Sequence, residues 1–216
     1  MIADLVIFDL DGTLVDSRAD LTAAINAMRQ HYNLPELSLE RVSGFIGNGM
    51  HSLVRRSLFD APEVVFEEAV ELNRSYYRDH LTVFTTCYPG VKEGIISLSE
   101  AGVKLAVLTN KPGLPSREIL EFFGLADYFV RIIGGGDGCE LKPEPEGLYA
   151  CMSAAGSTDK KRVWMIGDHY TDLEVAANAG VFSGFAGYGF GDSHGRTPDR
   201  VFNVFSEVTE FFTRAK

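Results

Sequence analysis

The chain has 216 residues, of which 45% are hydrophobic and 23% are charged, so it can bury a core and fits one α/β domain with a smaller insert, or two small domains. Its formal net charge of −10 argues against a general nucleic-acid binder, because sequence-independent binding of DNA depends on Lys and Arg side chains that neutralise phosphates. Three cysteines without metal-ligand spacing, an N-terminus without a basic segment and the lack of a long apolar run predict a cytoplasmic protein with no membrane span.

The first predicted element is a buried parallel strand at Leu5–Phe8, because this short apolar run is rich in branched residues and is closed by Asp-Leu-Asp-Gly. Residues 18–87 then show helical periodicity without a convincing strand. Three stretches carry this pattern, namely Asp20–Tyr32, Met50–Phe59 and Pro62–Leu81. Since ligands of open α/β sheets bind at the carboxyl ends of the strands, a helical insert directly after the first strand is expected to form a cap over the site.

Strands and helices alternate in the rest of the chain, which is typical of a doubly wound parallel sheet of the Rossmann type. Apolar runs predict four further strands, at Lys104–Thr109, Val130–Gly134, Val163–Gly167 and Val181–Ala186. Periodic apolar residues followed by glycines predict four crossover helices, at Val91–Ala101, Pro115–Phe123, Glu144–Ala155 and Thr171–Ala179. The predicted architecture is an α/β core of residues 1–16 and 89–216 with an inserted α-helical cap domain at residues 17–88.

Polar residues gather where the predicted strands end, or in the loop that follows one. They are Asp9 with Asp11, Thr109 with Asn110, Lys142, and Asp168 with Asp172. Because the carboxyl ends of parallel strands share one edge of the sheet, these side chains are expected to converge on one pocket. Taken singly, each has an ordinary interpretation as a helix cap, a turn residue or a surface lysine, so the prediction depends on their combination.

The four aspartates predict a magnesium site. Asp9 and Asp11 lie two residues apart on an extended segment, so both carboxylates can face one pocket. Two like charges this close need a cation, and Asp168 and Asp172 supply further oxygens of the kind that Mg²⁺ prefers. Such an ion would screen a phosphate dianion from a carboxylate that attacks it.

The same residues can support phosphoryl transfer. Lys142 offers a fixed positive charge, while the Thr109 hydroxyl and the backbone N–H groups near Asn110 can donate to phosphate oxygens. Asp9 as a nucleophile would form a covalent intermediate, which divides one difficult step into two. Asp11 could protonate the leaving oxygen and then take a proton from the attacking water.

Four ordered segments contain these residues: DLDGTLVDS (Asp9–Ser17), the strand that ends in Thr109-Asn110, Lys142-Pro143, and GDHYTD (Gly167–Asp172). In this order they resemble the four motifs of haloacid dehalogenase superfamily phosphatases. The resemblance implies that Asp9 is the nucleophile and a magnesium ligand. It also implies that Asp11 is a general acid and base that binds the ion through its carbonyl.

The resemblance further implies that Thr109 and Lys142 hold the phosphoryl group, and that Asp168 binds magnesium with Asp172 in the metal shell. The implied reaction is the Mg²⁺-dependent hydrolysis of a small phosphate monoester through an aspartyl-phosphate. The implied partner is a small phosphorylated metabolite, and the chain is expected to be a monomer or a homodimer.

Two longer segments, LPELSLERVSGFIGNGMHSLVRRSL and YPGVKEGIISLSEAGVKLAVLTNKP, resemble the phosphoglycolate phosphatase group of this superfamily. This resemblance implies that the substrate is phosphoglycolate-like and that Gly47, Asn48 and Gly49 form a cap loop near it. It also implies substrate binding by Arg56, for which a surface ion pair on a helix is the alternative interpretation.

Two features depart from the pattern of the family or are not fixed by it. His169 stands where relatives more often carry a small polar residue. The preferred interpretation is an exposed histidine in a turn, and the alternative is a residue beside the metal. The loop Phe185–His194 either borders the phosphate site or is a plain surface loop.

Several alternatives are narrowed by the sequence. Asp11 argues against a dehalogenase, which needs no second acid after the nucleophile, and the lack of a lysine between Arg18 and Tyr88 argues against phosphonate hydrolysis through a Schiff base. No GxGxxG opens the helix after the first strand, so an NAD-binding oxidoreductase is set aside. A β-phosphoglucomutase-like mutase, an inorganic pyrophosphatase and a catalytically silent phosphate-binding module stay open.

Overall fold

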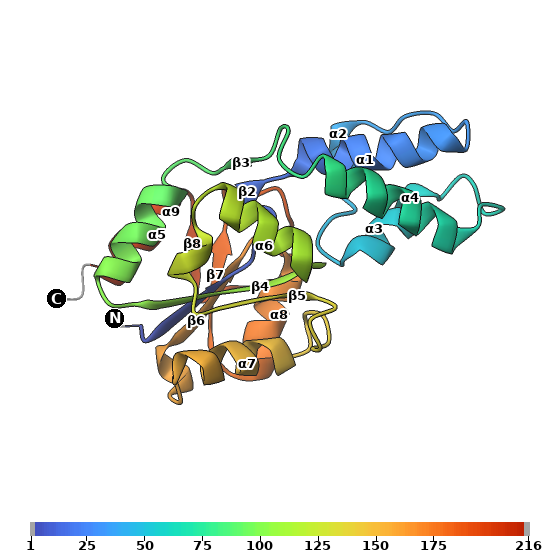
Figure 1. Cartoon of the computed structure of the whole chain (residues 1–216). Helices are drawn as coiled ribbons and strands as arrows, with labels where there is room; N and C mark the ends of the chain where they lie inside the picture. Colours follow the sequence, from blue (N-terminus) through green and yellow to red (C-terminus); the bar gives the residue numbers. More distant parts are fainter. Residues whose placement is uncertain (1–2, 214–216) are drawn as a thin grey trace.

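A computed structural model describes residues 3–213, so the outermost ends of the predicted core, residues 1–2 and 214–216, lie outside the described part. A six-stranded, all-parallel sheet forms the centre of the larger unit, with the order β5-β4-β1-β6-β7-β8 (Figure 1). Its strands are β1 (Leu5–Phe8), β4 (Lys104–Pro112), β5 (Arg131–Gly135), β6 (Val163–Gly167), β7 (Phe182–Ala186) and β8 (Arg200–Phe202). The predicted doubly wound α/β core is therefore confirmed.

Helices cover both faces of the sheet. One face is covered by α5 (Val91–Glu100), α6 (Gly113–Phe122) and α9 (Phe205–Thr213), and the other by α7 (Glu146–Ala155) and α8 (Tyr170–Ala179). Side chains of β1 alternate between the two layers, because Val6 and Phe8 pack under the first set while Leu5 and Ile7 pack under the second. A strand buried on both faces must be apolar at every position, which explains the continuous run LVIF.

One lateral edge of the sheet, the end of β4 and a small two-stranded ladder differ from the sequence prediction. Neither β8 nor α9 was predicted, and β4 continues three residues beyond Thr109, to Pro112. A two-stranded antiparallel ladder, β2 (Val15–Asp16) with β3 (Thr86–Cys87), was also missed. This ladder joins the sheet to the helices of residues 18–79 at both of their chain connections.

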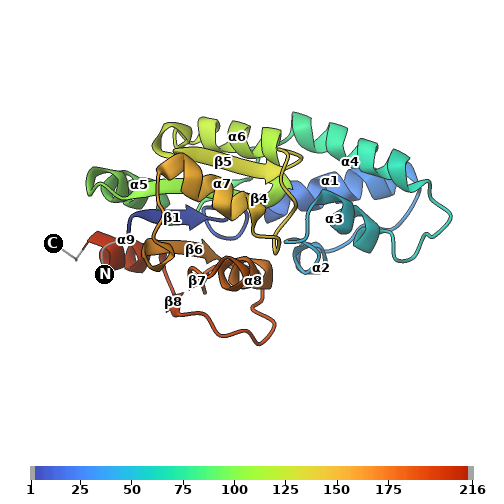
Figure 2. The same ribbon diagram turned by 90° about the horizontal axis from the view of Figure 1, so that it is seen from below.

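A second unit extends from the carboxyl ends of the strands (Figure 2). It consists of α1 (Arg18–His31), α2 (Leu39–Ser43), α3 (Met50–Ser57) and α4 (Phe66–Asp79). These helices enclose an apolar core of their own, in which Ile25 and Met28 of α1, Val54 of α3 and Val70 of α4 are buried. A unit with its own core can move as a body, and we propose that residues 17–88 act as the cap. No helix in residues 3–213 is long and apolar enough to cross a membrane.

Arg29 is the largest polar side chain buried in this helical unit. The Arg29 side chain is buried. It donates to the Pro35 and Ser57 carbonyl oxygens at 2.7 and 2.5 Å and pairs with both oxygens of Asp60 at 2.8 Å. Removing one partner of a buried, hydrogen-bonded pair costs several kcal/mol, and the partial exposure of Asp60 reduces this cost.

Arg29→Met is therefore expected to lower the free energy of unfolding by about 2 kcal/mol, because two backbone carbonyl oxygens lose their donor. Denaturant unfolding would measure the change. The matched control is Arg162→Met, which breaks the more exposed pair with Asp4 and should cost less than about 1 kcal/mol. Equal losses in the two variants would contradict the structural role of Arg29.

Candidate active site

The predicted polar residues meet at the carboxyl ends of the central strands, beneath the helical unit. Asp9 directly follows β1, Thr109 and Asn110 lie in β4, and Asp168 follows β6. Lys142 stands in the loop between β5 and α7. Parallel strands that end at one edge therefore bring together groups that are more than a hundred residues apart in the sequence.

Lys142 links two of the buried carboxylates. Its Nζ lies 3.0 Å from Asp9 Oδ1 and 2.6 Å from Asp172 Oδ1, and all three side chains are buried. Burial alone would lower the pKa of Lys142, but the charges of Asp172 and Asp9 outweigh it and raise this pKa. The ammonium group therefore stays charged at neutral pH.

The carboxylates themselves are short of positive charge. Burial raises the pKa of Asp9 to about 6, and Asp172 adds to the effect, against the opposing charge of Lys142 and hydrogen bonds from Thr109 and the Leu10 N–H. Burial, reinforced by Asp9 and Asp172, also raises the pKa of Asp168 well above its usual range. One lysine thus does not balance the negative charge of the cluster.

Asp9, Asp168 and Asp172 place one carboxylate oxygen each within 4.8 Å of one another. Three buried oxygens at this spacing suit a hard divalent cation such as Mg²⁺, and the raised pKa values show that a further positive charge would stabilise the ionised cluster. Gly12 passes close to this cluster with φ +85°, and a Cβ there would collide with the Asp168 carboxylate. Only glycine fits both conditions.

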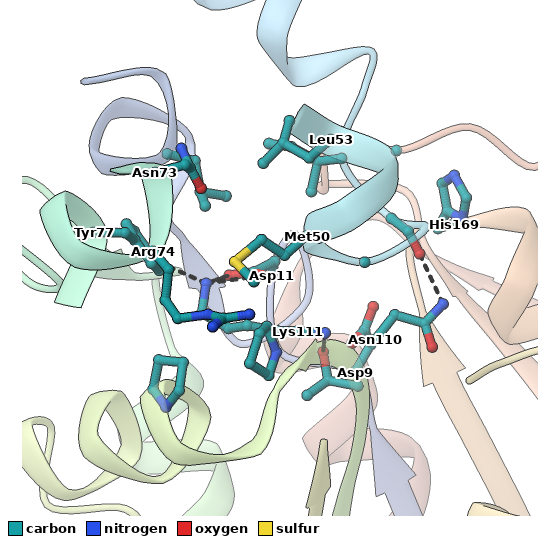
Figure 3. Close-up of a pocket in the computed structure, with 18 of the residues that line it drawn as sticks. Asp9, Asp11, Met50, Leu53, Asn73, Arg74, Tyr77, Asn110, Lys111 and His169 are labelled. Atoms are coloured by element: carbon teal, nitrogen blue, oxygen red, sulfur yellow. Dashed lines mark hydrogen bonds and ion pairs between the residues drawn. The ribbon is translucent and has the colours of Figure 1, made fainter. Parts of the chain in front are cut away.

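Asp11 lines the same cavity, but its carboxylate pairs with a lysine instead of joining this cluster. The Ser17 hydroxyl donates to Asp11 Oδ1 at 2.5 Å, and Lys111 Nζ lies 3.1 Å from both Asp11 oxygens. Lys111 also donates to the Tyr77 hydroxyl of α4 at 2.6 Å, so it joins the sheet edge to the helical unit (Figure 3).

Sequence reasoning missed Lys111, although β4 carried a signal for it. Thr109 and Lys111 both line the cavity, and their two-residue spacing along an extended segment is the signal that could have identified Lys111. Tyr77 and Asn73 were missed as well. The sequence of their helix does not indicate which of its sides faces the site, so they could not be found before the fold was known.

Asn110 positions the backbone around the site. Its Nδ2 donates to the carbonyl oxygens of Gly47 and Lys142 at 2.9 and 3.1 Å, and its Oδ1 accepts the Lys142 N–H at 2.8 Å. One side chain therefore fixes both the Lys142 loop and the cap loop. The predicted contact of Asn110 with substrate stays a prediction.

Of the predicted cap loop, Gly47 and Gly49 line the cavity. Gly47 has φ +112°, and a Cβ there would lie 2.6 Å from the His169 ring, so glycine is required for this close approach. Asn48 instead donates to the Tyr170 hydroxyl at 2.9 Å and accepts from Arg56 at 2.9 Å. Arg56 lies outside the cavity lining and holds the loop, and its predicted contact with substrate is still a prediction.

His169 is buried and lines the cavity, which corrects the expectation of an exposed turn histidine. It is the N-cap of α8, where its backbone N–H donates to Asp172 Oδ2 at 3.0 Å and its ring accepts from the Thr171 N–H. Burial lowers its pKa to about 4, so the ring is neutral at pH 7. The cap hydrogen bonds and the close packing against Gly47 together fix the position of the His169 ring.

The loop at 185–194 borders the site, which was one of its two predicted interpretations. The backbone N–H groups of Phe190 and Gly191 donate to Asp168 Oδ2 at 3.0 and 2.7 Å. These two hydrogen bonds hold the Asp168 carboxylate, which offers one oxygen to the cluster with Asp9 and Asp172. The glycines allow the backbone to come this close, since a Cβ on Gly191 would contact the Asp168 backbone.

A cavity of about 290 Å³ opens above the carboxylates. Figure 3 shows Asp9 at its floor and Met50 and Leu53 of α3 across from it. The wall on the side of the helical unit is largely apolar, apart from polar side chains of α4. This volume suits a small ligand whose charged end lies at the sheet edge.

Comparisons with known proteins agree with this geometry. Residues 6–186 match the family model described as haloacid dehalogenase-like hydrolase. The chain is 37% identical to proteins named phosphoglycolate phosphatase from Neisseria gonorrhoeae and Chromobacterium violaceum, over 95% and 94% of this chain and 91% and 93% of theirs. A crystal structure of a predicted phosphoglycolate phosphatase from Haemophilus somnus is similar with a TM-score of 0.89 and 32% identity, and covers 97% of both chains.

Proposed function

The chain belongs to the haloacid dehalogenase-like hydrolase family, and on that premise we propose that it hydrolyses a small phosphate monoester, with 2-phosphoglycolate as the first candidate. The observation that carries this proposal is the buried group of Asp9, Lys142, Asp168 and Asp172 at the floor of a small cavity, with Asp11 beside it. The choice of ester is supported by the names of the relatives and by the size of the cavity.

Asp9 is proposed as the nucleophile that accepts the phosphoryl group. Its Oδ1 receives the Leu10 N–H at 2.7 Å and Lys142 Nζ at 3.0 Å, and these contacts fix the orientation of the carboxylate. A carboxylate that is fixed in one rotamer loses little conformational entropy on reaching the transition state, which lowers the activation free energy. Lys142 and the Thr109 hydroxyl are proposed to hold the phosphoryl oxygens as charge develops on them.

Asp11 is proposed as the general acid that protonates the leaving alcohol and then as the base that takes a proton from water. Ser17 and Lys111 hold its carboxylate at the edge of the cavity. Two acids with different surroundings can divide the two tasks, because Asp9 contacts Lys142 and belongs to the carboxylate cluster, while Asp11 pairs with Lys111.

Asp9, Asp168 and Asp172, with the Asp11 carbonyl, are the proposed ligands of Mg²⁺. When bound, the ion would supply positive charge against both the carboxylates and the phosphate oxygens. The protein groups contribute the fixed oxygens, the backbone hydrogen bonds to Asp168 and the exclusion of water by burial.

The test is phosphate release with Mg²⁺ from 2-phosphoglycolate, ethyl phosphate, β-glucose 1-phosphate and pyrophosphate. A kcat/KM for 2-phosphoglycolate at least about tenfold above the others is expected, a difference of about 1.4 kcal/mol in transition-state binding. A preference for pyrophosphate, or conversion of β-glucose 1-phosphate to an isomer, would replace the proposed substrate with one of the alternatives. Release from none of the four would refute hydrolysis.

A further inference from the structure

Helix α4 presents two buried polar side chains to the cavity that no step of the proposed reaction uses. Asn73 and Tyr77 are one helical turn apart, so they lie on the same side of α4. They are 2% and 7% exposed, and both line the cavity that holds Asp9 and Asp11. Figure 3 shows both side chains on the side of the cavity away from His169.

Both side chains have an unused hydrogen-bond donor. Among residues 3–213, the Nδ2 of Asn73 has no hydrogen-bond partner, although it is buried. The Tyr77 hydroxyl accepts a hydrogen bond from Lys111 Nζ, and Lys111 is its sole partner in the described chain, so its own proton is free to be donated. Burial raises the pKa of Tyr77 to about 12, hence this proton is present at neutral pH. An unpaired buried donor costs stability, which a ligand with acceptor oxygens would recover.

A buried ammonium group lies beside these two donors, which suits an anionic acceptor. Lys111 is 6% exposed and its ammonium lies between the Tyr77 hydroxyl and the Asp11 carboxylate. Arg74 and Arg78 of the same helix also line the cavity, but each contacts a carboxylate of α4, Glu71 and Asp79 respectively, so they add little net charge. Because Lys111 is already paired with Asp11, one singly charged group is easier to balance here than a second phosphate dianion.

We infer that Tyr77 and Asn73, with the ammonium of Lys111 behind the Tyr77 hydroxyl, form a subsite for a carboxylate on the alcohol part of the substrate. The inference rests on the proposed function, because Asp11 must lie at the ester oxygen. One ammonium group separates the Tyr77 oxygen from Asp11, so the carboxylate would lie only a few bonds from the ester oxygen. The apolar side chains of Met50 and Leu53 limit the size of the group between them.

The first test compares 2-phosphoglycolate with ethyl phosphate, in which a methyl group replaces the carboxylate. Tyr77→Phe removes one hydroxyl and leaves the pair of Lys111 and Asp11 in place. It is expected to lower kcat/KM for 2-phosphoglycolate by about tenfold or more, mainly through KM, since a hydrogen bond to a charged group is lost. For ethyl phosphate the change should stay within about twofold.

The matched control is Tyr76→Phe, which removes a hydroxyl of the same helix outside the cavity and should leave both substrates unchanged. Asn73→Leu replaces the unpaired amide by an apolar side chain of similar volume and is expected to repeat the selective loss. Equal losses for both substrates in Tyr77→Phe would overturn the subsite, because they would show that Tyr77 acts only by holding Lys111 and Asp11.

A second test does not depend on turnover. Binding of 3-phosphonopropionate and of propylphosphonate, measured by calorimetry with Mg²⁺, compares two ligands that cannot be hydrolysed and differ in the carboxylate. At least about tenfold tighter binding of 3-phosphonopropionate, lost in Tyr77→Phe, supports the subsite even if no ester is hydrolysed and the proposed function fails. Equal affinities for the two phosphonates overturn the subsite even if hydrolysis is observed.

Discussion

Asparagine in place of Asp9 is expected to abolish phosphate release while the fold is kept. Asn has nearly the same volume, but its amide is not a nucleophile toward phosphorus at neutral pH, so no aspartyl-phosphate can form. Loss of a covalent nucleophile lowers kcat by at least about a thousandfold. Phosphate release under saturating substrate and Mg²⁺ measures the effect.

Stability provides the control for this variant. The pKa of Asp9 is raised to about 6, mainly by burial, so an uncharged side chain at position 9 should not lower the unfolding temperature of the metal-free protein. Asp127→Asn makes the same chemical change at an exposed position outside the cavity and should keep full activity. Activity of Asp9→Asn near that of the unaltered protein would exclude Asp9 as the nucleophile.

Buried strands could be predicted because burial on both faces requires a continuous run of apolar residues. The run VWMIG at Val163–Gly167 has the bounds that the structure gives to β6. Edge strand β8 has only three residues, and of these only Phe202 is buried, so no apolar run marks it. Pairing with β7 stabilises it, and that long-range contact is invisible to a local pattern.

Site residues on the sheet could be predicted for a related reason, since parallel topology alone brings the ends of β1, β4 and β6 together. Contacts between the sheet and the cap follow no such rule. The meeting of Lys111 with Tyr77 depends on how α4 lies over β4, and the burial of His169 depends on the approach of Gly47. These contacts cross between separately packed units, so the sequence near each residue does not specify them.

Removal of the divalent cation is expected to reduce turnover to background, and added Mg²⁺ is expected to restore it. The buried cluster of Asp9, Asp168 and Asp172 carries more negative charge than Lys142 can balance, so a phosphate dianion is repelled without a further cation. Phosphate release after dialysis against a chelator, with and without added Mg²⁺, measures this. Undiminished turnover in the chelated protein would contradict the proposed site.

Thermal unfolding with and without Mg²⁺ should show the same requirement for a divalent cation independently of activity. The folded pKa of Asp9, about 6, lies above its ordinary value of 3.8, so the folded state binds more protons between these values. The free energy of unfolding therefore falls as pH rises through this window. Mg²⁺ needs ionised carboxylates, hence it should stabilise the protein strongly at pH 7.5 and weakly at pH 5.

At a hundredfold excess over its Kd, the ion should add about 2.7 kcal/mol, which is roughly 5–10 °C in unfolding temperature for a chain of this length. Asp168→Asn removes one of the three clustered carboxylates and should abolish both this increment and turnover. Asp127→Asn should keep both. A stabilisation by Mg²⁺ that is independent of pH, or that survives in Asp168→Asn, would place the ion elsewhere, because a ligand that binds the cluster must compete with the protons that its raised pKa values retain.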